Sequence, residues 1–232
     1  REFLQRNNIY LTVLVSNKEL INFSCRNMDV IYDDTPKKSF LHKFYYEYIY
    51  LPNILKREKY EVYLSLQNTR IKKGPYKQFV LVHTPLPFEK LTLKDIELKN
   101  FLKYRLLLKL ILKFQISKID KLIVQTNWMK DSLKSLGYMK DIALLRPNTK
   151  SFRELKKPLS PEIEEKIKIN NKIKLIYPTN IEKYKNNKRL IEAVNKYNSS
   201  YINKQVVLFL TLEGQDSDSI KYLGKVPYES MY

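Results

Sequence analysis

The stretch Gln78–Pro87, QFVLVHTPLP, decides the fold class. It opens with an almost unbroken apolar run, which is typical of a strand buried on both faces of a parallel sheet. It closes with a loop that Pro85 and Pro87 stiffen. Similar short runs alternate with longer helical patterns along the chain. This alternation predicts α/β domains in which helices cover parallel sheets.

Other segments on either side of Gln78–Pro87 complete a first domain. The predicted strands are Ile9–Ser16, Glu61–Gln67, Lys121–Gln125 and Ile142–Leu145. The predicted helices are one that Ser39 caps and Pro52 interrupts, a long one over Lys94–Lys118, and one over Thr126–Leu136 that Gly137 ends.

A change of composition divides the chain. Lys150–Pro161 holds two prolines, several charges and few apolar residues, which predicts a linker. The alternation then restarts with a strand over Lys172–Tyr177, a helix over Asn187–Tyr197 and a strand over Gln205–Leu210. We therefore expect two Rossmann-like domains, residues 1–149 and 162–232, joined by residues 150–161, with the second incomplete. Arg1–Leu4 is typical of the end of a helix and Tyr228–Tyr232 of the start of one, so we expect the chain to be cut at both ends.

The charge balance is strongly basic. Lys and Arg number 43 against 24 Asp and Glu, a net charge of +19, which attracts the phosphates of nucleic acids, nucleotide-sugars or anionic lipids. The chain also uses Lys, Asn, Ile and Tyr heavily, which is the mix that AT-rich codons favour. The positive charge could therefore reflect codon composition and not selection for a charged partner. The single Cys25 excludes an internal disulfide and a cysteine-cluster metal site. No apolar run of about 18 to 20 residues and no signal peptide is visible, and we expect a cytoplasmic protein.

Ligands of parallel sheets bind beyond the carboxyl ends of the strands. Polar residues follow each predicted strand there, and we expect them to line a cleft or, alternatively, to serve as caps and turn residues: Asn68, Thr84, Thr126, Asn127, Asn148 and Asn180. His83 ends its strand in the same way, where an imidazole can hydrogen-bond a sugar or shuttle a proton. The alternative for His83 is a half-buried histidine with satisfied hydrogen bonds.

Two basic segments carry further hypotheses. Lys185 and Asn186 lie before a predicted helix, where a lysine and free N–H groups suit a pyrophosphate, although a solvated basic turn has the same pattern. In Lys94–Lys118, basic residues recur at four-residue spacing beside a wide apolar arc. Such a helix lies on an anionic membrane surface or packs on a core with a solvated edge.

Five segments in order resemble glycosyltransferases of the GT-B fold, family 4 type: Gln78–Pro87, Asp120–Lys130, Leu144–Asn148, Lys185–Ala193 and Tyr222–Glu229. The resemblance implies two facing Rossmann-like domains with a nucleotide-sugar donor held mainly by the second. It implies that His83 approaches the donor sugar as a catalytic residue, and that Lys185 and Asn186 bind the donor diphosphate. It also implies retention of configuration, no metal or cofactor, and a glycan or lipid-linked acceptor.

The chain departs from that family in three places. A Gly-rich loop after the first strand is missing, Asn180 stands where an arginine is common, and the paired glutamates of the donor site are expected only after Tyr232. We therefore expect a bacterial polysaccharide-biosynthesis glycosyltransferase, inactive as this fragment, in peripheral contact with the inner face of an anionic membrane and without a nucleic-acid partner. A basic nucleic-acid-binding protein and a non-catalytic relic of a glycosyltransferase stay open as alternatives.

Overall fold

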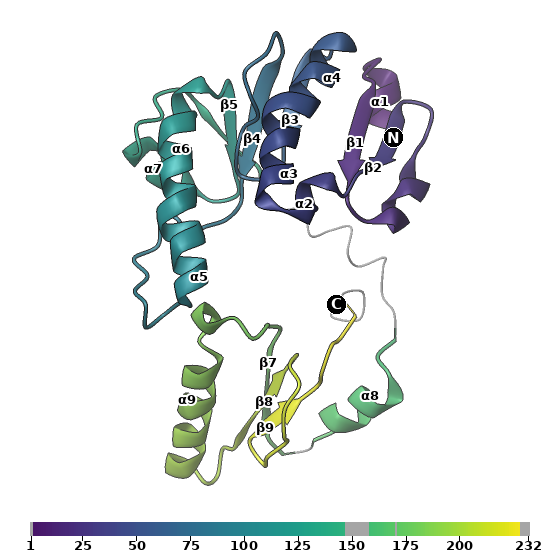
Figure 1. Ribbon diagram of the computed structural model, residues 1–232. Helices are drawn as coiled ribbons and strands as arrows, with labels where there is room; N and C mark the ends of the chain where they lie inside the picture. The colour runs from purple at the N-terminus through teal and green to yellow at the C-terminus, as the bar shows by residue number, and fades with distance from the viewer. Residues whose placement is uncertain (1, 147–157, 170, 228–232) are drawn as a thin grey trace. The chain divides into compact units, whose positions relative to one another are not determined.

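The computed structural model describes residues 2–146, 158–169 and 171–227 (Figure 1). The chain forms two compact units. Unit 1 comprises Arg1–Thr84 and Ile111–Leu145, and unit 2 comprises Pro85–Leu110 and Arg146–Tyr232. Every sheet among the described residues is parallel, so the predicted α/β class is confirmed.

Unit 1 contains a four-stranded sheet in the order β3-β4-β5-β6. Its strands are β3 Val62–Ser65, β4 Lys77–Val82, β5 Lys121–Val124 and β6 Ile142–Leu144. All four fall within or beside predicted strands. Alternate residues of β4 are fully buried, which places the core of the unit against this strand.

A second sheet of unit 1 pairs β1 Leu11–Val15 with β2 Met28–Tyr32. The sequence predicts the first strand but not the second. β2 carries the exposed Asp29 within a five-residue run, so it lacks the apolar pattern that identifies the other strands.

The helices of unit 1 are short. They are α1 Glu2–Arg6, the 3-10 turn η1 Lys18–Phe23, α2 Thr35–Lys38, α3 Phe40–Tyr45, the π-helical η2 Tyr46–Tyr50, α4 Leu51–Arg57, α6 Lys109–Gln115 (which begins in unit 2), the 3-10 turn η4 Ile116–Lys118, and α7 Asn127–Ser135. Ser39 caps α3 as predicted, because its side chain accepts a hydrogen bond from the His42 amide at 3.2 Å.

The predicted interruption at Pro52 is wrong. The helix runs from α3 through the π turn η2 into α4, with Pro52 in the first turn of α4. A proline has no N–H, so a carbonyl of the preceding turn is left without a helical partner. The Glu47 carbonyl accepts instead from the Lys72 amide at 3.1 Å, which satisfies it from outside the helix.

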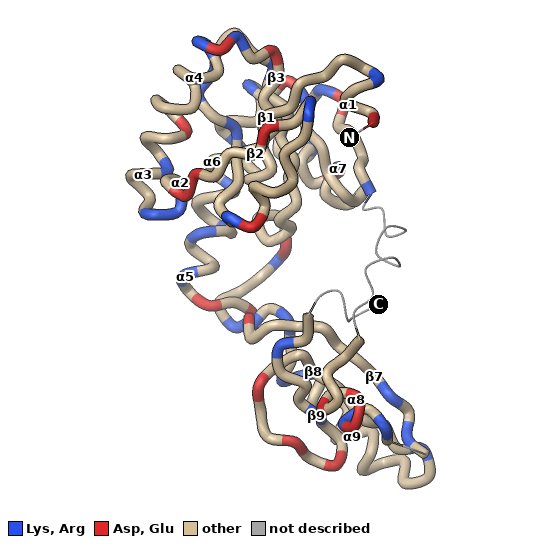
Figure 2. The backbone as a smooth tube through the Cα atoms, turned by 90° about the vertical axis from the view of Figure 1, so that its right-hand side faces the viewer, with Lys and Arg blue, Asp and Glu red and all other residues tan. Residues whose placement is uncertain are grey.

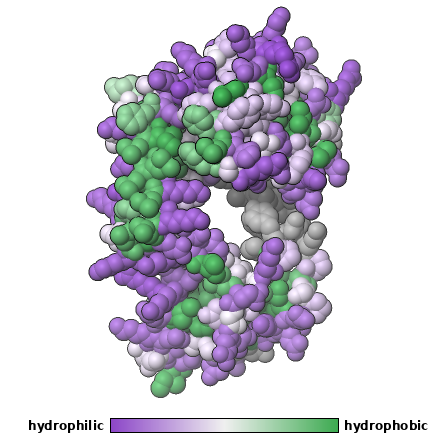
Figure 3. Space-filling model, viewed as in Figure 1, coloured by the Kyte–Doolittle hydropathy of each residue, from purple (hydrophilic) through white to green (hydrophobic). Residues whose placement is uncertain are grey.

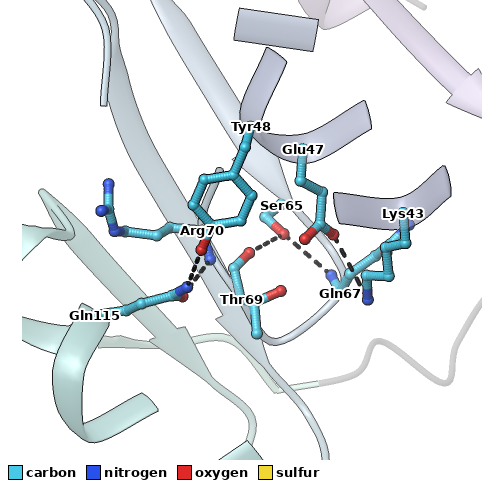
Figure 4. A network of polar contacts seen from close by, with 8 residues as sticks. All are labelled: Lys43, Glu47, Tyr48, Ser65, Gln67, Thr69, Arg70 and Gln115. Carbon is cyan, nitrogen blue, oxygen red and sulfur yellow. Dashed lines mark hydrogen bonds and ion pairs between the residues drawn. The ribbon is translucent and has the colours of Figure 1, made fainter. Parts of the chain in front are cut away.

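Strands β3 and β4 are joined by a crossover in which the structure has no helix. Buried backbone groups must still be paired, so side chains take over this role (Figure 4). Ser65 Oγ donates to the Thr69 carbonyl at 2.6 Å, and Gln115 Oε1 accepts from the Arg70 amide at 3.2 Å. Gln78, which is 1% exposed, accepts from the Ile71 amide at 3.1 Å. Side chains of β3, β4 and α6 thus hold one irregular segment in place.

Unit 2 has a three-stranded sheet in the order β7-β8-β9, formed by Ile173–Tyr177, Val206–Leu210 and Ile220–Tyr222. One face packs on α9 Asn187–Ser200 through residues such as Val194, and the other on α8 Pro161–Ile167 through Ile163. β8 is buried along its whole length, as a central strand covered on both faces should be.

The predicted strands over Lys172–Tyr177 and Gln205–Leu210 and the helix from Asn187 match the structure of unit 2. The sequence misses β9, which has only three residues, and α8, which begins at Pro161 inside the predicted linker. Residues 150–157 of that linker and the predicted helix start at 228–232 lie outside the described residues. The boundary between the two predicted domains stays a prediction.

The predicted helix over Lys94–Lys118 begins later, at Leu98. It consists of α5 Leu98–Asn100, the π-helical η3 Phe101–Leu108, α6 and η4. Among the residues described, no helix combines the length and the apolar character needed to cross a membrane.

Candidate functional site

The carboxyl edge of the unit 1 sheet holds several of the predicted site residues. Asn68 is buried with a left-handed backbone, φ 65°, and its Oδ1 accepts from the amides of His83 and Thr84 at 2.9 and 3.0 Å. This side chain therefore fixes the backbone just beyond β4. The His83 side chain is exposed there.

The neighbouring strand β5 ends at the same edge, because β4 and β5 are parallel. Thr126 is the N-cap of α7, and its Oγ1 accepts from the Met129 amide at 3.3 Å. Asn127 is the first residue of that helix and is exposed. Asn148, the next predicted residue, lies outside the described residues.

In unit 2 the connection from β7 to α9 is tightly hydrogen-bonded. The Thr179 amide donates to Thr211 Oγ1 at 2.8 Å, and Thr211 Oγ1 donates to the Thr179 carbonyl at 2.9 Å. Asn187 Nδ2 donates to the Asn180 carbonyl at 2.6 Å, and Asn180 Oδ1 accepts from the Glu182 amide at 3.2 Å. Asn180 therefore acts as a turn residue within this loop.

Lys185 and Asn186 end this connection. Lys185 closes the 3-10 turn η6 Lys183–Lys185, and its carbonyl accepts from the Tyr177 hydroxyl at 3.1 Å. Asn186 has a left-handed backbone, φ 56°, and is followed directly by α9, whose first amides receive no hydrogen bond from a side-chain cap. The amides at the start of this helix are thus available to an anion.

The three lysines of this region differ in their partners. Lys183 Nζ donates to the Leu93 carbonyl at 3.4 Å, and Lys188 Nζ lies 3.9 Å from a Glu192 carboxylate oxygen. Lys185 Nζ lies over the Tyr184 ring, 5.6 Å from its centroid, and has no ion pair with any described carboxylate. Lys185 is therefore the lysine of this group that is best placed to meet an external anion.

A shallow, open depression of about 530 Å³ lies beside this turn. It is lined by Tyr177, Lys185, Asn186, Arg189, Leu190 and Ala193. Two of these lining residues, Lys185 and Arg189, are basic and none is acidic, while the walls of the depression are formed mainly by apolar atoms. Arg189 is the last residue of the basic segment Lys183–Arg189, in which the sequence assigns the phosphate-binding role to Lys185 and Asn186.

The loop that contains Lys185 is also held by residues 93–100, from the other part of unit 2. Asn100 Nδ2 donates to Glu182 Oε2 at 2.9 Å, and Glu182 lies three residues before Lys185. Asp95 lies in the same region, and its pKa is lowered chiefly by hydrogen bonds from Thr92, with smaller contributions from the positive charges of Lys183 and Arg189. The loop is thus anchored on the N-terminal side of Lys185, at Glu182 and Lys183.

No protein-family model matches the sequence, and no curated protein matches it either. Within residues 2–146, 158–169 and 171–227, no group of three or more His, Cys, Asp or Glu side chains is arranged to hold a metal ion. The pairing of His83 with Lys185 in one active site stays a prediction, since these residues belong to different units.

Proposed function

We propose that the chain is part of a glycosyltransferase that uses a nucleotide-sugar donor, and that the donor diphosphate binds at the β7–α9 connection. One observation carries this proposal. The uncapped start of α9 lies beside Lys185, which has no described carboxylate partner, in a depression that also contains Arg189.

The chemistry of this arrangement suits a diphosphate. Free amides at a helix N-terminus and the helix dipole favour a negatively charged group, and a lysine adds a full positive charge. In glycosyl transfer the bond between the anomeric carbon and the diphosphate oxygen breaks, and the diphosphate leaves with the electron pair. Lys185 and the α9 amides would stabilise the charge that develops on it.

The acceptor hydroxyl forms the new bond to the anomeric carbon, and its proton passes to the departing diphosphate oxygen. In this proposal the acceptor is a glycan or a lipid-linked sugar, and His83 hydrogen-bonds the reacting sugar. Support for His83 comes from its exposed side chain and from the Asn68 bonds that fix its backbone at the end of β4. Retention of configuration, and a role in bacterial polysaccharide synthesis on the cytoplasmic side, rest on the family resemblance.

The test is the affinity of the chain for nucleoside diphosphates. We expect UDP or GDP to bind the wild type, and Lys185→Ala to weaken binding about tenfold or more, as the loss of a charge-assisted hydrogen bond implies. Lys188→Ala is the matched control, because Lys188 is a neighbouring lysine that is paired with Glu192. Its affinity should be unchanged in the same calorimetric titration.

Two results would contradict the proposal. One is a wild type that binds neither nucleotide, and the other is equal affinity in both variants. Tight binding of oligonucleotides that weakens steeply with salt, without nucleotide binding, would favour the nucleic-acid alternative instead.

A further inference from the structure

The helical run from Leu98 to Gln115 carries an exposed apolar stripe. Its members recur every four residues and are 46% to 72% exposed: Leu98, Leu102, Leu106, Leu110 and Phe114. Figure 3 shows hydrophobic residues gathered along this run, with hydrophilic ones beside them. Large apolar side chains in a row are unusual on a surface that meets only water.

The π-helical segment keeps this stripe on one side. An α-helix has 3.6 residues per turn, so a four-residue repeat drifts round it. The wider turns of η3, closed by i→i+5 bonds, drift in the opposite sense. A run that passes from α5 through η3 into α6 therefore holds residues four apart nearly in line.

Cations border the stripe on both sides. Each lies next in sequence to a stripe residue: Lys99, Lys103, Arg105, Lys109 and Lys113. No Asp or Glu occurs from Leu98 to Ile119. Arg105 donates to the Pro87 carbonyl at 3.0 Å, whereas Lys103 lies over the Tyr104 ring and forms no ion pair among the described residues. Figure 2 marks these basic positions on the run.

We propose that this face lies on the surface of an anionic phospholipid bilayer. Leucines flanked by lysines match the two layers of such a surface, since the apolar side chains enter the acyl boundary while the ammonium groups remain at the phosphates. The charge argument selects this occupant, because an acid-free basic border complements lipid phosphate. The proposal does not depend on sugar transfer.

The experiment is co-sedimentation of the full chain with vesicles. We expect binding to mixed phosphatidylcholine and phosphatidylglycerol vesicles at low salt, and little binding to phosphatidylcholine alone. Replacing Lys99, Lys103 and Lys109 by Gln should lower the partition coefficient at least about tenfold. Replacing Lys168, Lys196 and Lys204 by Gln is the matched control, because it removes the same charge from other elements and should change binding far less.

A second pair of variants tests the apolar stripe. Leu102→Gln with Leu106→Gln should also reduce binding about tenfold, and both positions are exposed, so folding should survive. An environment-sensitive fluorophore on Leu106→Cys, in a Cys25→Ser background, should shift to the blue only with anionic vesicles.

Three outcomes would overturn the proposal. They are binding that ignores lipid charge, binding that the leucine variants leave intact, and a lipid-free wild-type dimer that the leucine variants dissociate. The last result would assign the face to a second copy of the chain.

Discussion

At the scale of single residues, asparagine takes the place that glycine holds in most proteins. The chain has only four glycines, and four of its five described non-glycine residues with positive φ are asparagines: Asn8, Asn68, Asn171 and Asn186. Asparagine tolerates the left-handed region because its short amide can bond locally. The Asn68 side chain also accepts hydrogen bonds from the backbone just beyond β4. A glycine at this position could adopt the same backbone conformation but could not make these bonds.

Buried amide side chains carry part of the fold in the same way. We expect Gln78→Met to lower the free energy of unfolding by about 1–3 kcal/mol, because the buried Ile71 amide would lose its acceptor. Gln67→Met, at an exposed position, is the control and should change stability by less than about 0.5 kcal/mol. Urea unfolding measures both, and equal midpoints would refute this role of Gln78.

Glu47 provides a prediction about pH. Burial raises the pKa of this carboxyl above its ordinary 4.5, although the Lys43 ammonium, 3.5 Å away, acts in the opposite direction. Well below pH 4.5 the carboxyl is protonated in the folded and unfolded chains alike, so it does not reduce the free energy of unfolding. As pH rises through the raised folded pKa, the unfolded chain releases its proton first, so stability falls.

Glu47→Gln should remove this dependence. The unfolding free energy of the variant, relative to wild type, should rise as the pH is increased from about 4 to about 7. A difference that stays constant, or falls, over this range would show that the carboxyl is not destabilised by burial.

At the scale of elements, the predicted site residues divide into those that hold a helix or loop and those that face outward. Thr126 and Asn127 are adjacent, yet only Thr126 caps α7. Thr126→Ala should cost about 1 kcal/mol of stability, while Thr126→Ser should retain most of it. Asn127→Ala is the matched control, and thermal unfolding of the three variants distinguishes a capping role from a ligand-facing one.

The elements themselves were predictable where burial leaves a continuous apolar run. β4, β5 and β8 have such runs, whereas β2 is broken by Asp29 and β9 is too short to show a period. The capping role of Ser39 is local and was predicted. The continuation of the helix through Pro52 cannot be predicted locally, because the partner of the freed carbonyl, the Lys72 amide, is 25 positions along the chain from Glu47.

In the candidate site, too, local patterns are predictable from the sequence and contacts between distant residues are not. Lys185 and Asn186 follow from a local pattern at the start of a helix. The bonds from Asn68 to the amides beyond β4 join residues 15 and 16 positions apart, and no periodicity indicates them. Arg189 is equally local, because it belongs to the same basic segment as Lys185 and lies in the first turn of α9.

At the scale of the whole molecule, unit 2 is assembled from two separate parts of the chain. Residues 85–110 join residues 146–232, and the Asn100–Glu182 hydrogen bond links the parts. A double-mutant cycle with Asn100→Ala and Glu182→Ala should give a coupling energy of about 1 kcal/mol, since the bond is charge-assisted and only partly buried. Strictly additive effects on urea unfolding would show that the bond contributes nothing.

The sheet of unit 2 has β7 at one margin, with Ile173, Leu175 and Ile176 all exposed. In the part of the chain that the structure describes, no strand pairs with the outer edge of β7, and an edge with apolar side chains on both faces is a template for another extended chain. The purified protein should therefore aggregate increasingly as its concentration rises. Leu175→Lys should reduce this aggregation, because a charged side chain on the edge strand opposes pairing between molecules.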